Sequence, residues 1–563
     1  MTENRSIEKQ KKAILTFSVI AMAIGFLLRI ANIGNISLEY DEIWTFTHYV
    51  PGECLKIFTD LATPNNHPLH SMLAKISVGI FDNELWALRL PALLAGCGLI
   101  PLLWYTVHKL KPSPEAGVIA IVWGAFHGYS LYYSQAARGY SLQMFFVLAT
   151  FLGMWLLYKN PQSKKTTLLL VCSAICCCLT ITSGLIYVCA LAGAFTLCFL
   201  LQKEENKVLL LRKKYILFPV AGLCFILFAA LWYGLNFKTI QQGQQFGTTL
   251  NSFSVFCKFV HQTFKDIFLY PLLAITIAGT CIKNQYRRFA VFALLFTGLI
   301  LLSAFATKAG PPRVYLGLYP ILTVTAAMTL SALIDEYCKK PQIRIILYLL
   351  CVLPPALTWQ KEWTRVTPPD WGRIAAQVRQ DVSKDILTVY TPPDSYPVRY
   401  NDTETVPDQL MRINQVNING IFLINTQKPV GSHHLTVANT LFAEKLDIPG
   451  QRIQMDNRKV TGYFYPLEPV TIHSKTYRQP LLLVIRNIPE TKYRTIFNSS
   501  INKKDLDWLL LNLWLVENQR DTVNNITYIN RIYGLNEAQY DAEHYLDITR
   551  RSGGLFRFYL FKK

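Results

Sequence analysis

Cysteine is missing from the last third of the chain. All 13 cysteines lie between Cys54 and Cys351, and residues 359–563 contain none. A domain without cysteine has no disulfide framework, so that segment needs an ordinary hydrophobic core, which its length can supply. Long apolar runs are also absent after Thr358, where short ones alternate with Pro, Asn and charged residues. We therefore expect residues 359–563 to form a soluble domain.

Acidic residues are scarce. The chain has 36 Asp and Glu against 56 Lys and Arg, a formal net charge of +20, and most of the excess lies before residue 359. No basic stripe with interleaved aromatic residues accompanies this charge, which argues against nucleic acid as a partner. Anionic lipid and the insertion machinery explain positive charge in the cytoplasmic loops of a membrane protein.

Metal-binding motifs are also lacking, since the sequence has no HExxH motif, carboxylate triplet or histidine cluster. We therefore predict no metal ion and no other cofactor. A divalent cation held by Asp41, Glu42 and one added ligand stays open as an alternative. The run from Cys176 to Cys178 lies in apolar sequence and is interpreted as small packing residues of a helix.

Apolar sequence, in contrast, is abundant: 51% of residues are hydrophobic, in blocks of about twenty that are typical of membrane-spanning helices. The first block, Ala13–Ile33, follows a short basic head without an evident cleavage site and predicts a retained helix. Together the blocks predict a polytopic α-helical membrane protein with about eleven spans. The other ten are Trp86–Val107, Ala116–Tyr133, Tyr140–Leu157, Thr166–Thr182, Leu185–Leu201, Tyr215–Leu235, Phe264–Ile282, Phe289–Ala306, Val314–Leu333 and Ile343–Thr358.

Basic residues in the short loops predict the orientation. With the N-terminus in the cytoplasm, the inside loops carry the basic clusters around Lys109, Lys164, Lys213, Arg287 and Lys340. An odd number of spans then puts the C-terminus outside. The chain is thus predicted to have a membrane domain over 1–358 and an extracytoplasmic domain over 359–563.

The C-terminal segment has the pattern of a small mixed α/β domain. Helical spacing covers Arg373–Val382 and Leu506–Leu515. Strand-like runs are Ile386–Tyr390, Gly420–Ile424, Leu481–Ile485 and Phe556–Phe561.

Two adjacent carboxylates, Asp41 and Glu42, follow the first apolar block. A carboxylate at the membrane surface can accept a proton from an acceptor group, which suggests chemistry on a lipid-linked substrate. The alternative is a loop carboxylate that pairs with a cation or caps a surface helix.

Further motifs follow the carboxylate pair in a fixed order: Asn66-His67-Pro68, then Leu85-Trp86-Ala87-Leu88-Arg89-Leu90-Pro91, then Tyr133-Ser134-Gln135-Ala136-Ala137-Arg138-Gly139-Tyr140. This arrangement over residues 13–140 resembles the bacterial branch of the dolichyl-phosphate-mannose protein mannosyltransferase superfamily. These polytopic glycosyltransferases of the GT-C fold use polyprenyl-phosphate sugars and include the aminoarabinose transferase that acts on lipid A.

The resemblance implies roles for individual residues. Asp41 matches the general base that acts on the acceptor, and Glu42 matches its companion carboxylate. Arg138 matches an arginine near the donor phosphate, where a guanidinium offers two donors to phosphate oxygens. The alternative for Arg138 is an interfacial arginine whose charge reaches the lipid headgroups.

Three further basic residues resemble phosphate contacts of the family. His67 matches a His or Lys position near the phosphate, although it can equally structure its loop. Arg313 resembles the basic residue ahead of a late span, with Lys308 nearby, although a single cation at a helix end is also common for topology alone. One departure is Ala136, because family members often carry an acidic residue there, and its absence leaves Asp41 with most of the proton transfer.

The implied mechanism is a single inverting displacement on the extracytoplasmic side of a bacterial inner membrane. The donor is a polyprenyl-phosphate sugar and the acceptor is a lipid, glycan or protein of the envelope. Amide side chains in the loop 236–262 suit a hydroxyl-rich ligand, although a plain connector explains that loop as well. A polyprenyl-lipid flippase or transporter is the alternative function, but such proteins usually place charges or broken helices at mid-membrane in paired halves.

Overall fold

The computed structural model describes most of the first 367 residues and eight strands beyond them. The described ranges are 2–31, 33–34, 36, 38–81, 85–111, 113–200, 215–244, 247–282, 285–338, 340–367, 386–390, 420–425, 451–455, 460–466, 470–472, 475–477, 483–485 and 556–558. The chain divides into two compact units: Met1–Asn35 with Trp44–Thr367, and Ile36–Ile43 with Pro368–Lys563.

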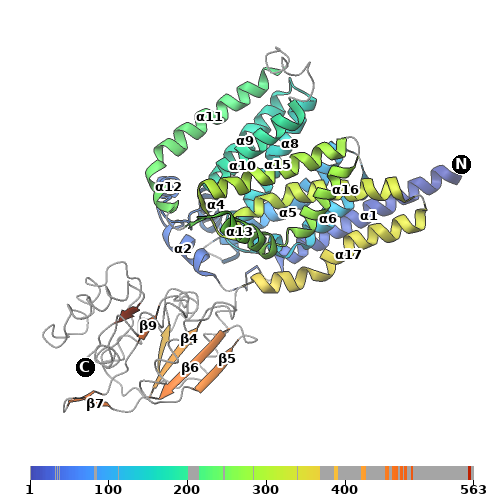
Figure 1. Cartoon of the computed structure of the whole chain (residues 1–563). Helices are drawn as coiled ribbons and strands as arrows, with labels where there is room; N and C mark the ends of the chain where they lie inside the picture. Colours follow the sequence, from blue (N-terminus) through green and yellow to red (C-terminus); the bar gives the residue numbers. More distant parts are fainter. Residues whose placement is uncertain are drawn as a thin grey trace. The chain divides into compact units, whose positions relative to one another are not determined.

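The first unit is helical (Figure 1). Seven of its described helices are long and apolar enough to cross a membrane, or eight if one bent pair forms a single span. The chain is therefore a multi-pass membrane protein, and a count of eleven spans is not confirmed. The seven spans are Lys12–Ile30, Leu85–Leu110, Tyr140–Lys159, Leu217–Leu235, Tyr286–Ala306, Pro312–Tyr337 and Gln342–Thr364.

These spans belong to α1 (Thr2–Ile30), α5 (Leu85–Leu110), α8 (Tyr140–Lys159), α11 (Leu217–Leu235), α15 (Gln285–Ala306), α16 (Leu318–Tyr337) and α17 (Pro341–Val366). The shorter helices are α2 (Tyr40–His48), α3 (Cys54–Thr59), α4 (Pro68–Ile80), α6 (Pro114–Phe126), α7 (Gly128–Gln135), α9 (Lys164–Thr180), α10 (Gly184–Phe195) and α12 (Phe237–Gly243). α17 continues through Val366, past the boundary expected at residue 358.

Two segments expected as single helices are interrupted. The segment 116–133 is split into α6 and α7 at His127, whose extended backbone ends one helix while its ring accepts a hydrogen bond from the Ser130 amide to begin the next. The segment 264–282 overlaps α13 (Phe253–Asp266) and α14 (Tyr270–Ala278), which are bent by 104° to each other. Hydropathy alone does not register such breaks.

α6 packs against α1, α5, α16 and α17, which Figure 1 shows in the same region of the bundle. Small residues allow the close packing: a Cβ on Gly25 of α1 would lie 2.8 Å from the Cβ of Ala125 in α6. The buried core follows the same helices, with Leu99, Ile100 and Leu103 of α5 fully enclosed. Dense apolar packing of this kind fixes the polar segments that interrupt it.

The second unit contains a four-stranded sheet in the order β3-β4-β6-β5. Its strands are β3 (Ile386–Tyr390), β4 (Gly420–Asn425), β5 (Gln451–Met455) and β6 (Val460–Pro466). β3 and β4 are parallel, whereas β6 is antiparallel to both of its neighbours. Smaller pairs join β7 (Val470–Ile472) to β8 (Lys475–Tyr477), and β9 (Leu483–Ile485) to β10 (Phe556–Phe558).

The strand predicted at Ile386–Tyr390 is confirmed with the same bounds, and those at Gly420–Ile424, Leu481–Ile485 and Phe556–Phe561 each overlap an observed strand. The helices predicted at Arg373–Val382 and Leu506–Leu515 lie outside the described residues. The mixed α/β character of this unit therefore stays a prediction.

The turn between α9 and α10 yields a test of the packing. A Cβ added to Gly184 would lie 2.1 Å from the Cys177 carbonyl oxygen, a backbone atom that cannot move away easily. We expect Gly184→Ala to lower the free energy of unfolding by about 1–3 kcal/mol, measured as a lower Tm in detergent. Gly222→Ala is the control, because nothing lies within 4 Å of a Cβ there. Equal Tm values for the two variants would contradict the tight turn.

Candidate functional site

Arg138 lies in the short link between α7 and α8. Its amide donates to the Ala136 carbonyl at 2.7 Å, which tightens the link. Its side chain is buried and donates from Nη1 to the Asn65 carbonyl at 2.9 Å. The guanidinium therefore joins two segments far apart in sequence, the α7–α8 link and the loop that precedes α4.

Tyr140, the first residue of α8, lies between two arginines. The Arg138 guanidinium carbon is 5.8 Å from the centroid of its ring, within the range of a cation–π contact. Its hydroxyl accepts a hydrogen bond from Arg313 Nε at 3.0 Å. Arg313 belongs to η7 (Pro312–Gly317), a 3₁₀ turn that precedes α16. The structure thus brings both predicted arginines to the same tyrosine.

His67 packs against the same ring. It precedes Pro68 at the start of α4, it is buried, and its ring meets Tyr140 edge-on with centroids 5.1 Å apart. Gly139 permits this approach, because a Cβ there would lie 2.7 Å from His67 Nδ1 and 2.9 Å from the Thr180 carbonyl oxygen. The predicted phosphate contacts His67, Arg138 and Arg313 therefore form one group around Tyr140, called here the Tyr140 cluster.

His70, one turn along α4 from His67, is a residue that sequence reasoning missed. Its side chain is 1% exposed, and neither of its ring nitrogens has a hydrogen-bond partner among the described residues. Buried polar atoms without a partner are rare in proteins and often face an ion or water. The signal was the His-Pro-Leu-His spacing, which puts both imidazoles on the first turn of one helix.

The electrostatics around the two histidines are positive. Burial first, and the Arg138 charge second, lower the pKa of His70 from 6.5 to about 3. Burial, followed by Arg138, His70 and Arg313, lowers the pKa of His67 well below its usual value. Both rings are therefore neutral at physiological pH, in a buried region where positive charge disfavours another cation and favours an anion.

Asp41 and Glu42 lie in the first turn of α2, which starts at Tyr40 in the second compact unit. Glu42 is buried and its carboxylate accepts a hydrogen bond from the Glu39 amide at 3.0 Å. A glutamate at the third helical position that accepts from the residue before the helix is half of a capping box. The alternative of a helix-capping carboxylate thus applies to Glu42, whereas Asp41 is half-buried and its role as a base stays a prediction.

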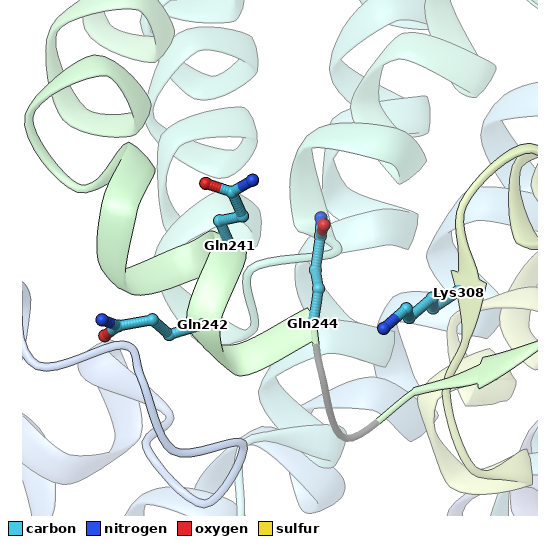
Figure 2. A pocket seen from close by; sticks show the side chains of 4 residues that line it. All are labelled: Gln241, Gln242, Gln244 and Lys308. Atoms are coloured by element: carbon cyan, nitrogen blue, oxygen red, sulfur yellow. The ribbon is translucent and has the colours of Figure 1, made fainter.

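Lys308 lies on β2 (Lys308–Ala309), which pairs with β1 (Thr248–Thr249). It lines an open pocket of about 320 Å³ with Gln241, Gln242 and Gln244 at the end of α12. Figure 2 shows the three amides on one side of this pocket and the ammonium group of Lys308 on the other. Amides and an ammonium suit a ligand with hydroxyl and anionic oxygens. The phosphate role of Lys308 stays a prediction.

The side chains of the Tyr140 cluster are chemically suited to an anion. Two guanidinium groups offer forked donors that match phosphate oxygens, and they stay charged at any working pH. Neutral imidazoles add donors without adding charge. Within the described ranges, no three His, Cys, Asp or Glu side chains come together as potential metal ligands.

Comparison with known proteins finds a family model that matches one part of the chain. Residues 64–233 match the family model described as dolichyl-phosphate-mannose-protein mannosyltransferase. This segment includes His67, His70, Arg138 and Tyr140. No curated protein sequence matches the chain significantly.

Two solved structures illustrate the similarity in three dimensions. ArnT from Cupriavidus metallidurans is 12% identical, with 81% of this chain and 98% of that chain covered and a TM-score of 0.48. The oligosaccharyltransferase from Archaeoglobus fulgidus is 12% identical, with 92% and 84% covered and a TM-score of 0.49.

The depressed pKa values predict how stability depends on pH. Between about pH 3 and pH 6.5 an unfolded chain with ordinary histidines binds more protons than the folded one, so the free energy of unfolding falls as pH falls through this window. We expect the Tm in detergent to be highest above pH 6.5 and to drop by several degrees at pH 4.5. His70→Gln should flatten this drop.

His48→Gln is the matched control for the pH experiment, because that imidazole is exposed. Its pH profile should follow that of the unmodified protein. A profile for His70→Gln that is as steep as the control would contradict a buried, neutral His70.

Proposed function

We propose that the chain is a membrane glycosyltransferase that moves a sugar from a polyprenyl-phosphate donor to an envelope acceptor, because residues 64–233 match the dolichyl-phosphate-mannose-protein mannosyltransferase family model. The observation that carries this proposal is the Tyr140 cluster, where Arg138 and Arg313 flank one ring. The acceptor is a lipid, a glycan or a protein, and the reaction takes place on the extracytoplasmic side of a bacterial inner membrane.

In this proposal the two arginines bind the donor phosphate. As the bond between the sugar and the phosphate breaks, the leaving polyprenyl phosphate gains negative charge, and the guanidinium groups of Arg138 and Arg313 offset it. His67 and His70 remain neutral and contribute N–H donors. A monophosphate leaving group carries less total negative charge than a diphosphate, so we propose that protein cations suffice.

Asp41 is proposed as the general base. The acceptor oxygen attacks the anomeric carbon while its proton passes to the Asp41 carboxylate, and the phosphate leaves from the opposite face with inversion at that carbon. Glu42 holds the first turn of α2 through its bond to the Glu39 amide, which keeps the neighbouring Asp41 in a defined backbone position. Glu42 is thus proposed as a positioning residue for Asp41.

The pocket beside Lys308 is proposed to accommodate the hydroxyl groups of the sugar or the acceptor. Three amides supply both donors and acceptors, as a hydroxyl-rich ligand requires. A Cβ on Gly243 would lie 2.6 Å from the Leu61 carbonyl oxygen, so α12 packs closely on the loop that also supplies Asn65 to Arg138. That loop therefore contacts both α12 and the guanidinium.

The donor role of Arg138 is tested by binding. We expect Arg138→Gln to raise the Kd for undecaprenyl phosphate in detergent by about 30- to 100-fold, because charge-assisted bonds to the phosphate are lost. Arg138→Lys should recover only part of the affinity, since an ammonium lacks the fork. Arg287→Gln, an exposed arginine on α15, is the control and should bind as the unmodified protein does.

The base role of Asp41 is tested by transfer. With a radiolabelled prenyl-phosphate sugar, Asp41→Asn should lower transfer by about 10²- to 10⁴-fold and leave undecaprenyl phosphate binding unchanged. Glu53→Gln is the control, because that carboxylate is exposed in the same connection. Full transfer by Asp41→Asn would refute the base, and translocation of the labelled lipid without transfer would favour a transporter.

A further inference from the structure

The break between α6 and α7 lies directly before the Tyr140 cluster in the chain. α6 ends at Phe126 and α7 begins at Gly128. A helix end exposes carbonyl groups and a helix start exposes amide groups, and inside an apolar bundle each needs a partner. The two ends also carry opposite partial charges, negative at the end of α6 and positive at the start of α7.

Arg29 of α1 caps the end of α6. Its side chain is fully buried, and it donates to the carbonyls of Ala125 at 3.0 Å and Gly124 at 2.8 Å. It also donates to the hydroxyls of Ser134 and Ser130 in α7. With a further bond to the Gly25 carbonyl, all five of its N–H donors are used.

Glu362 of α17 caps the start of α7. Its Oε2 accepts from the Gly128 amide at 3.0 Å, and its Oε1 accepts from the Thr358 hydroxyl at 3.1 Å. The carboxylate is buried. Gly128 makes the approach possible, since a Cβ there would lie 2.4 Å from the Glu362 Cβ. The Arg29 cation thus lies at the negative end of α6 and the Glu362 carboxylate at the positive start of α7, so both charges interact favourably with the helix dipoles.

The far end of α7 is fixed to the same two helices. Gln135 donates from Nε2 to the carbonyls of Leu28 and Ala31, both at 2.9 Å, at the end of α1. Its Oε1 accepts from Trp363 Nε1 at 2.8 Å. α7 is therefore held at its start and at its end by α1 and α17, and Arg138 follows three residues later.

We propose that Arg29 and Glu362 are positioning residues for the donor phosphate, which act by fixing α7 and, through it, the backbone of Arg138. The role in donor binding rests on the proposed function, whereas the contacts that fix α7 do not depend on it. Both residues pack on α7 and contact the backbone or hydroxyls of α6, α7 and their own helices. Loss of either cap leaves polar backbone groups unsatisfied in an apolar surrounding and loosens the link that carries Arg138.

The first experiment needs no ligand. Hydrogen–deuterium exchange is measured on peptides that cover residues 128–140 in the full-length protein in detergent. Glu362→Gln should speed exchange there, because a neutral amide replaces the charged cap. Arg29→Lys should do the same, because lysine lacks the five N–H donors of the guanidinium group. Trp363→Phe, which removes the bond to Gln135 but keeps an aromatic side chain and both charged caps, is a milder variant. Glu115→Gln, in the first turn of α6 at its opposite end, should leave exchange unchanged.

The second experiment separates positioning from general stability. Glu362→Gln should raise the Kd for undecaprenyl phosphate by about tenfold, which corresponds to about 1.4 kcal/mol. In an Arg138→Gln background the same substitution should have no further effect, since its influence passes through that guanidinium. A variant that merely weakened the fold would lower affinity in both backgrounds.

Two results would overturn the inference: unchanged exchange at 128–140 in both charge variants, or equal losses of affinity with and without the Arg138 side chain. Should Glu362→Gln not fold, Trp363→Phe supplies the same cycle with a smaller expected loss. Failure of the proposed function gives a different result, in which the unmodified protein does not bind undecaprenyl phosphate while the exchange difference persists.

Discussion

Satisfying backbone polar groups inside an apolar bundle is the constraint on which the site depends. The helical chain is interrupted at His127, between α6 and α7. Arg29 donates hydrogen bonds to carbonyls at the end of α6, and Glu362 accepts one from an amide at the start of α7. Neither residue has to contact a substrate. By satisfying the backbone polar groups at the helix break, they hold the chain in one conformation where it turns toward Arg138. The helix bundle thereby makes the link between α7 and α8, which carries Arg138, more rigid.

The Tyr140 cluster shows how distant segments bring basic side chains together around one ring. Arg138 comes from the link after α7, Arg313 from the turn before α16, and His67 from the start of α4. The ring of Tyr140 separates the two guanidinium groups and binds one through its hydroxyl. Burial keeps the imidazoles neutral, so the positive charge of the cluster is that of its arginines. A phosphate matches this combination of forked donors and excess positive charge.

The sequence predicted those features that depend on local pattern. Long apolar blocks gave the helices later found as α5, α8 and α15, and alternating apolar runs gave β3 with its bounds. Motifs in the sequence also singled out Arg138, His67 and Arg313, which the structure brings together around Tyr140, and their phosphate roles stay predictions. The helix break at His127 was missed because the residues that cap it, Arg29 and Glu362, lie far from it in the sequence. His70 was missed because the His-Pro-Leu-His spacing does not reveal which charges surround the second imidazole.

The central claim is that the Tyr140 cluster holds the donor phosphate. A structure of the protein with undecaprenyl phosphate bound tests it most directly. The account predicts phosphate oxygens within hydrogen-bond distance of the guanidinium groups of Arg138 and Arg313. A phosphate bound away from both guanidinium groups, with the Tyr140 cluster unchanged and unoccupied, would contradict it.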